Sequence, residues 1–398
     1  MSTLSPAEVR ALFPATERAT YLNAAASSPI SLPVEKAIVD HYREAAQSGD
    51  LHFDAWLRRR EEVRGRVARL IGAGARDVAF VGSTSWGFHL AARILQQRGV
   101  SEVVTLEGEF PSTTVPFLHL GFQLRVVRRR ADGSFSVEDI AASVGPHTGA
   151  IAASAVQYAS GFRLDLAGLS RLCRDRRLAF ALNAAQALGQ IPIDVRAERV
   201  DFLCAPSHKW MMGGYGVGIF YARAEMLDEV DLPAAGWLSV EKPWSMEALP
   251  GARIASADGE RWFEARGVRI RREVPALEIG SHALGTIFGA GAGIEILDAV
   301  GIGAIERHNA ALQQFLRAEL RKRGFQPNAP DDPLRGAGIC VFGVEGNAPS
   351  VARELAHKGV VVSARGGGLR VATHVFNTED DVARLVDALD AAGIRPPK

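Results

Sequence analysis

The sequence contains few cysteines and has no excess of charge of either sign. Its 398 residues include three cysteines, and 46 lysines and arginines are balanced by 45 aspartates and glutamates, which leaves a formal net charge of +1. Because the balance is not basic, the composition does not indicate a nucleic-acid partner. Cys173, Cys204 and Cys340 are too few and too widely spaced for a disulfide framework or a zinc site. We therefore predict buried structural thiols and no metal site.

Long apolar runs are also missing. None approaches the length that spans a membrane, and residues 1–17 mix charges with prolines instead of forming the apolar core of a signal peptide. We therefore expect a cytoplasmic protein with no membrane partner. The 47% of hydrophobic residues are enough to bury a large core, and a chain of this length indicates about two domains.

Between about residues 77 and 223, short apolar segments typical of buried strands alternate with amphipathic stretches typical of helices. Such alternation predicts an α/β fold in which a mostly parallel sheet is covered by helices on both faces. The predicted strands are 78–81, 102–106, 122–127, 150–156, 178–182, 202–205 and 218–221.

The pattern changes in the last third of the chain. Residues 277–300 and 302–323 have the periodicity of long helices, and shorter strands and helices follow, ending in a helix at 378–392. This pattern predicts a smaller α+β domain. We place an N-terminal arm at 1–20, the large domain at 21–275 and the small domain at 276–398. The irregular stretch 233–275 is expected to form loops near the mouth of the active site.

A lysine follows one of the predicted strands. The segment Ser207-His208-Lys209-Trp210 comes directly after the strand at 202–205 and before a glycine-rich turn. The Lys209 amine is therefore expected at the carboxyl ends of the strands, where open α/β sheets bind ligands. An amine in that place can form a Schiff base with an aldehyde cofactor, which makes pyridoxal phosphate (PLP) the leading hypothesis. The alternative is an ordinary solvated lysine.

Asn183 and Gln186 follow the preceding predicted strand. With the lysine segment they resemble the corresponding elements of PLP enzymes of aminotransferase class V, a family that includes cysteine desulfurases, selenocysteine lyases and isopenicillin N epimerase-like proteins. The resemblance covers nearly the whole chain and is most specific around Lys209. It implies a fold-type I enzyme with PLP as cofactor and a small amino acid or amino-acid conjugate as substrate.

The resemblance implies a role for each matching residue. Lys209 would bind the cofactor and then act as the general base, Asn183 and Gln186 would contact the pyridine nitrogen and the phenolic oxygen, and Phe110 would stack on the ring. The other cofactor contacts would be Thr84, Ser85, Ser207, His208, Gly280 and Ser281. The last two belong to an element that reaches the phosphate of the other subunit in this family, which implies a homodimer with shared sites.

On the substrate side, Arg370 matches the arginine that holds the α-carboxylate of the substrate in a bidentate fork. Asn23 and Ala25 belong to a segment that resembles the substrate loop of the family. Alternatives from the residues alone stay open. Arg370 could form a surface salt bridge, Thr84 and Ser85 could belong to an ordinary helix cap, and Phe110 could be a core residue.

Two departures from the family pattern bear on the reaction. Asn183 replaces an aspartate that normally keeps the pyridine nitrogen protonated, so the ring becomes a weaker electron sink. A weaker sink disfavours transamination more than β-elimination. No cysteine lies near 360–368, where desulfurases carry their persulfide-forming nucleophile. We therefore predict β-elimination of the carbon–sulfur lyase type, with an aminotransferase or an epimerase as alternatives and a catalytically silent PLP-binding protein last.

Overall fold

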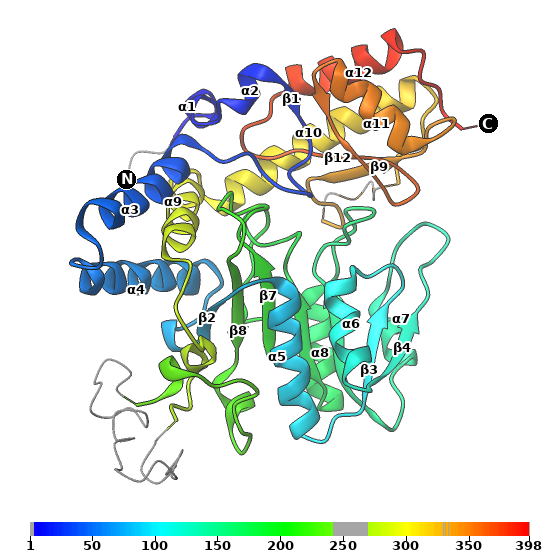
Figure 1. Ribbon diagram of the computed structural model, residues 1–398. Coiled ribbons are helices and arrows are strands. Elements are labelled where there is room, and N and C mark those ends of the chain that lie inside the picture. Colours follow the sequence, from blue (N-terminus) through cyan, green and yellow to red (C-terminus); the bar gives the residue numbers. More distant parts are fainter. Residues whose placement is uncertain (1–3, 242–269, 329, 331, 333, 398) are drawn as a thin grey trace, which may run out of the picture.

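The computed structural model describes residues 4–241, 270–328, 330, 332 and 334–397. Its centre is a seven-stranded sheet with the strand order β2-β8-β7-β6-β5-β3-β4 (Figure 1). The strands β3 to β7 pair in parallel, whereas β8 runs antiparallel to β2 and β7. The predicted mostly parallel α/β sheet is thus confirmed. The strands are β2 (Val78–Val81), β3 (Glu102–Leu106), β4 (Gln123–Val127), β5 (Thr148–Ser154), β6 (Ala179–Asn183), β7 (Phe202–Pro206) and β8 (Gly218–Ala222).

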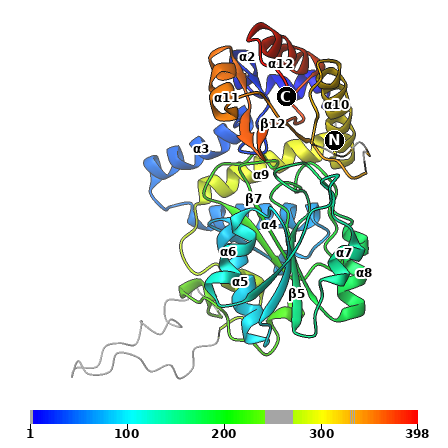
Figure 2. The ribbon, with the colours of Figure 1, turned by 90° about the vertical axis from the view of Figure 1, so that its right-hand side faces the viewer.

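Each face of the sheet has its own hydrophobic core because side chains alternate along a strand. In β2, Ala79 and Val81 belong to one core, whereas Val78 and Phe80 belong to the other. Figure 2 shows α5 and α6 on one side of the sheet and α7 and α8 on the opposite side, as predicted. These helices are α5 (Thr84–Gln97), α6 (Pro111–His119), α7 (Val137–Ala142) and α8 (Leu166–Arg176).

Helices from both ends of the chain pack over one face. The long helix α9 (Leu284–Val300) packs against α3 (Leu32–Ser48) and α4 (Phe53–Leu70). Gly293 of α9 lies so close to the turn after Lys209 that an added Cβ would be 2.1 Å from the Met211 carbonyl oxygen. No larger residue fits there, so α9 supports the lysine turn directly.

The last third of the chain forms a second group of elements, at the top of Figure 1. Its three-stranded antiparallel sheet has the order β11-β12-β9, and β1 near the N-terminus pairs in parallel with β10. The elements are α1 (Pro6–Ala11), α2 (Ala15–Arg18), β1 (Thr20–Tyr21), α10 (Ile302–Lys322), β9 (Ile339–Phe342), α11 (Ala348–His357), β10 (Val360–Val361), β11 (Ser363–Arg365), β12 (Gly368–Ala372) and α12 (Glu379–Ala391). Short 3-10 helices lie at Ala75–Asp77, Ala224–Leu227, Trp237–Ser239 and Val274–Leu277.

No single helix in the described ranges is long and apolar enough to cross a membrane, and only α9 and α10 taken together, with a bend of 79°, meet that test. The stretch 233–275 was expected to form loops near the mouth of the active site. Residues 242–269 lie outside the described residues, and the remaining part does not line the pocket described below.

The helix predicted at 277–300 begins only at Leu284, so this prediction is wrong for residues 277–283. The reason is Glu278, whose buried carboxylate accepts hydrogen bonds from the Arg64 guanidinium and from the backbone N–H of Phe80. These bonds hold Glu278 against β2. The residues that follow lead away from the sheet, and the helix begins after them, at Leu284. Arg64 is almost fully buried and also donates to the Val78 carbonyl oxygen.

We predict that Glu278→Gln destabilises the fold by about 3 kcal/mol, because it leaves the buried Arg64 charge without its main partner. The measurement is the shift of the thermal or denaturant unfolding midpoint.

Glu295→Gln is the matched control. Glu295 pairs with Arg66 of the same helix α4 at 2.9 Å but is 57% exposed, so its loss should cost less than about 1 kcal/mol. Equal losses in the two variants would show that the Arg64–Glu278 pair does not hold this region together.

Candidate active site

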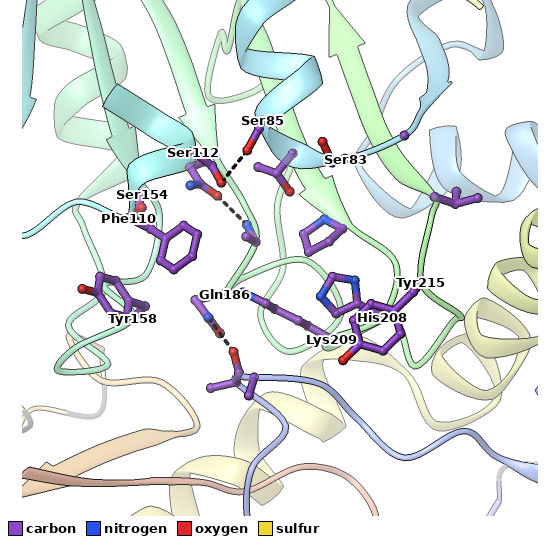
Figure 3. Close-up of a pocket in the computed structure, with 18 of the residues that line it drawn as sticks. Ser83, Ser85, Phe110, Ser112, Ser154, Tyr158, Gln186, His208, Lys209 and Tyr215 are labelled. Carbon is purple, nitrogen blue, oxygen red and sulfur yellow. Dashed lines mark hydrogen bonds between the residues drawn. The ribbon is translucent and has the colours of Figure 1, made fainter. Parts of the chain in front are cut away.

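A cavity of about 400 Å³ lies where β5, β6 and β7 end (Figure 3). Ser154 ends β5, Asn183 ends β6, and Lys209 follows β7. Because parallel strands end at the same edge of a sheet, residues far apart in the sequence meet in this cavity. The opposite wall comes from the last third of the chain, through Arg365 and Arg370.

One end of the cavity offers backbone N–H groups and hydroxyls. Ser83 caps the N-terminus of α5, and its hydroxyl accepts a hydrogen bond from the Trp86 N–H. The next residues, Thr84 and Ser85, line the cavity in the first turn of the helix, and Ser85 donates to the Ser112 hydroxyl at 3.0 Å. Free N–H groups at a helix N-terminus together with hydroxyls are suited to bind a phosphate group.

The Lys209 amine lies 5.5 Å from the centre of the Phe110 ring. Burial and, to a smaller extent, the charge of Arg370 lower the pKa of Lys209 to about 8. Roughly a tenth of this amine is therefore uncharged at pH 7, far more than for an ordinary lysine, and a nucleophile or base requires the uncharged form. Its neighbour His208 stacks on Tyr215, and burial lowers the pKa of His208 to about 4, so that its ring is neutral.

Gln186 is held by hydrogen bonds at both ends of its amide. The nitrogen donates to the Ala25 carbonyl oxygen at 2.9 Å, and the oxygen accepts from the Trp210 indole at 2.8 Å. The N-terminal segment is thereby joined to the lysine turn. Phe110 extends into the cavity and meets Tyr158 edge-on, with 5.3 Å between ring centres.

Arg370 is 2% exposed and donates only to neutral oxygens, the Ser363 hydroxyl and the Tyr158 carbonyl. Burial, followed by the charge of Arg365, lowers the pKa of Arg370 to about 10. Neither arginine forms an ion pair with any carboxylate of the described residues, and no aspartate or glutamate is among the described residues that line the cavity. The cavity is therefore suited to an anionic ligand that would balance its cations.

Most of the predicted site residues meet in this cavity, and some do not. Among the residues that line it are Ala25, Thr84, Ser85, Phe110, Asn183, Gln186, His208, Lys209 and Arg370. Ser207 is turned away, because its hydroxyl bonds to the carbonyl oxygens of Gly214 and Val217 and so shapes the glycine turn. Asn23 pairs with Ala372 through the backbone instead of lining the cavity. Gly280 and Ser281 also lie outside the lining of this chain's own cavity.

Sequence reasoning missed Arg365, because its place in the cavity depends on a hairpin register. Two strand positions separate Ser363 from Arg365, and Ser363 lies opposite Arg370 in the hairpin of β11 and β12. Side chains two apart on a strand share a face, so Arg365 and Arg370 point to the same side. Ser112, Ser154, Tyr158 and Tyr215 also line the cavity and were not predicted.

The three cysteines are buried, as predicted, and they lie away from the cavity. All are buried, and burial raises the pKa of Cys173 and Cys340 to about 12. None belongs to the cavity lining. Within the described ranges there is also no cluster of three or more histidine, cysteine or acidic side chains that could hold a metal ion.

The chain resembles known proteins over almost its full length. The family model of aminotransferase class-V matches residues 20–250 and 259–386. An uncharacterized aminotransferase of Bacillus subtilis, YcbU, is 25% identical over 98% of both chains. The solved apo structure of a cysteine desulfurase from Thermococcus onnurineus has a TM-score of 0.86 with 23% identity, and covers 98% of this chain and 99% of its own. A mutant of C-DES with glycine covalently linked to its PLP cofactor has a TM-score of 0.81 with 18% identity, and covers 96% of this chain and 98% of its own.

The cavity fits PLP as cofactor. The first turn of α5 offers donors for the phosphate, the Lys209 amine is available for the aldehyde, and the Phe110 ring stands beside it. The unpaired cations are consistent with an anionic cofactor and an anionic substrate group.

We predict that PLP uptake by the apoprotein follows the deprotonated fraction of Lys209. Because the pKa of Lys209 is lowered to about 8, the uptake rate should rise with pH and level off above that value. Arg370→Gln removes a neighbouring positive charge, so it should raise the pKa of Lys209 and move the midpoint to higher pH.

Stopped-flow absorbance measures the midpoint, and Arg365→Gln is the control with the smaller expected shift. Borohydride reduction followed by peptide mapping should locate PLP on Lys209. A cofactor attached to another residue would contradict the assignment.

Proposed function

The chain belongs to the aminotransferase class-V family and is a PLP-dependent enzyme, and from this premise we propose that it catalyses β-elimination on a cysteine-like amino acid or cysteine conjugate. The observation that carries the proposal is the neutral Asn183 at the end of β6, in a cavity that no cysteine lines. A desulfurase that forms a persulfide on its own cysteine would need such a thiol.

Bound PLP supplies an aldehyde that condenses with amines and a ring that accepts electrons from the substrate carbon next to the amine. Lys209 would hold the aldehyde carbon covalently and release it to the amine of the incoming substrate. The freed Lys209 amine, with its pKa near 8, would then take the proton from Cα. The bond from Cβ to sulfur would then break, and sulfur would leave with the bonding electrons and take up a proton. Water would hydrolyse the released 2-aminoacrylate to pyruvate and ammonia.

Arg370 would orient the substrate. Its guanidinium is buried and held by Ser363 and Tyr158, so that a carboxylate could accept two parallel N–H bonds from it. Arg370 would thereby place Cα within reach of Lys209, since both residues line the same cavity. Phe110 and Tyr158 would exclude water from the ring face on which the proton moves.

Asn183 supports elimination over transamination. A neutral amide against the ring nitrogen stabilises negative charge at Cα less than the family's aspartate does. Elimination removes that charge at once through the leaving group, whereas transamination must hold it until a proton returns. The likeness to an uncharacterized aminotransferase keeps transamination as the second candidate, and epimerisation as the third.

We predict that the holoenzyme releases pyruvate together with hydrogen sulfide from cysteine, or together with a thiol from a cysteine S-conjugate. Lys209→Ala should lower the rate at least about a thousandfold. Arg370→Gln should mainly raise KM, because it removes a carboxylate contact.

The assay follows thiol, pyruvate, keto acid and cofactor absorbance in parallel over a panel of amino acids. Keto acid formed from a natural amino acid, without thiol from any conjugate, would replace elimination with transamination.

We further propose a homodimer in which Gly280 and Ser281 complete the phosphate site of the partner. Ser281 is exposed and does not line its own chain's cavity, although Glu278 anchors the same loop firmly to β2. A loop that is fixed at its base and exposed at its tip is suited to reach a second chain.

Mixed dimers test this arrangement. One chain carries Lys209→Ala and the other a disrupting change at Ser281. If Ser281 acts in the partner's site, one site contains both defects and the other is intact, so about half of the activity remains. If it acts in its own site, each site has one defect and little activity survives. A fully active monomer would exclude shared sites.

A further inference from the structure

The carboxylate of Glu109, in the turn after β3, is surrounded by hydrogen-bond donors. One oxygen accepts from the Ser154 backbone N–H and the Gln157 amide, and the other accepts from the hydroxyls of Ser154 and Thr113. Four donors occupy the four lone-pair positions that an ionised carboxylate has. Burial raises the pKa of Glu109, and these four donors act in the opposite direction. Among the described residues Glu109 has no ion-pair partner, so its charge is balanced by hydrogen bonds alone.

Thr113 connects Glu109 to Asn183. The Thr113 hydroxyl is fully buried, and its single proton is given to Glu109 at 3.1 Å. It can therefore only accept from Asn183, and the Asn183 amide nitrogen does donate to it at 2.8 Å. At the other end of the amide, the oxygen accepts from the Ala185 N–H at 2.9 Å. Both ends consequently fix the Asn183 amide in the same orientation.

An aspartate at position 183 does not fit this set of protons. The carboxylate oxygen that takes the place of the Asn183 amide nitrogen would face the Thr113 hydroxyl oxygen. The one proton of that hydroxyl is already donated to Glu109. Two carboxylates would share one proton in a buried site, and one of them would have to take up a proton from solvent.

We propose that Glu109, acting through Thr113, is a positioning residue: it fixes the orientation of the Asn183 amide and disfavours an aspartate at that position. The network of Glu109, Thr113 and Asn183 holds only one negative charge. The charge that the family pattern places beside the cofactor ring is thereby moved to Glu109, on the far side of the Thr113 hydroxyl. This inference uses the assignment of PLP to the cavity but not the proposed elimination reaction.

The network makes a specific prediction for the double variant E109Q/N183D. The introduced glutamine donates to the Thr113 oxygen, and Thr113 then gives its own proton to the introduced aspartate. The contacts of residue 109 are kept, and the bonds to the Thr113 and Ser154 hydroxyls reverse their direction. The Ser154 proton, which has lost its acceptor, turns toward the cavity that Ser154 lines, and the negative charge moves next to the ring. In the single variant N183D this rearrangement is not possible, because the Thr113 hydroxyl still donates its proton to Glu109.

The experiment is a double-mutant cycle on the dissociation constant of pyridoxamine phosphate, which binds without a covalent link to Lys209. N183D changes this dissociation constant by some factor in each background. At pH 8 that factor should favour binding at least about tenfold more when residue 109 is Gln than when it is Glu. In the background that keeps Glu109 the penalty should shrink as the pH falls to 6, because the introduced aspartate has a raised pKa and takes up a proton. Lys209, Arg365 and Arg370 also line the cavity, but they are common to both backgrounds and cancel in the cycle.

A second variant tests whether the single proton of Thr113 is what disfavours an aspartate at position 183. T113N supplies two amide protons, one for each carboxylate, so T113N/N183D should bind the cofactor better than N183D while Glu109 is kept. The nitrogen-15 shift of the labelled cofactor ring should move toward the protonated value in both double variants. N347D, an exposed Asn-to-Asp change, is the control and should have no effect. Equal effects of N183D in the two backgrounds, with no pH dependence, would overturn the proposal, since a merely structural Glu109 predicts that result.

Discussion

The candidate site depends on the parallel pairing of β5, β6 and β7. Their common direction brings Ser154, Asn183 and the Lys209 turn to one edge, and α9 presses on that turn so closely that only glycine fits at position 293. The antiparallel strand β8 pairs with β7, and the Ser207 hydroxyl bonds to the carbonyl oxygen of Val217, the residue directly before β8. Positions in the site are thus set by backbone pairing, and the side chains add chemistry to a frame that is already in place.

The charges of the cavity form a second constraint. Lys209, Arg365 and Arg370 line it without a carboxylate among the described lining residues, and the nearest acidic group, Glu109, lies behind Thr113. Burial and, to a smaller extent, the charge of Arg370 lower the pKa of Lys209, and the positive charge of the cavity favours anionic ligands. The same property prepares the lysine for its covalent role and attracts a phosphate and a carboxylate.

The sequence allowed the sheet to be predicted almost completely, because the inner strands are short, mainly apolar segments, as burial on two faces requires. The start of α9 could not be predicted, since it depends on the distant pairing of Glu278 with Arg64. In the site, Lys209 was predicted because it follows such a strand, and Asn183 because its segment resembles that of the family. Arg365 and the role of Glu109 were not, because they follow from a hairpin register and from a chain of hydrogen bonds that only the folded molecule brings together.

The wall opposite Lys209 is made by the two ends of the polypeptide. Thr20 and Tyr21 pair with Val360 and Val361 as two short parallel strands. The carbonyl oxygen of Ala25 accepts a hydrogen bond from Gln186, and Arg370, ten residues after Val360, lines the cavity. During synthesis on the ribosome, the segment that carries Lys209 therefore emerges well before the residues that enclose it. Until that wall is in place, the cavity lacks Arg365 and Arg370. Lys209 is then without the charge of Arg370 and without part of the burial that lowers its pKa.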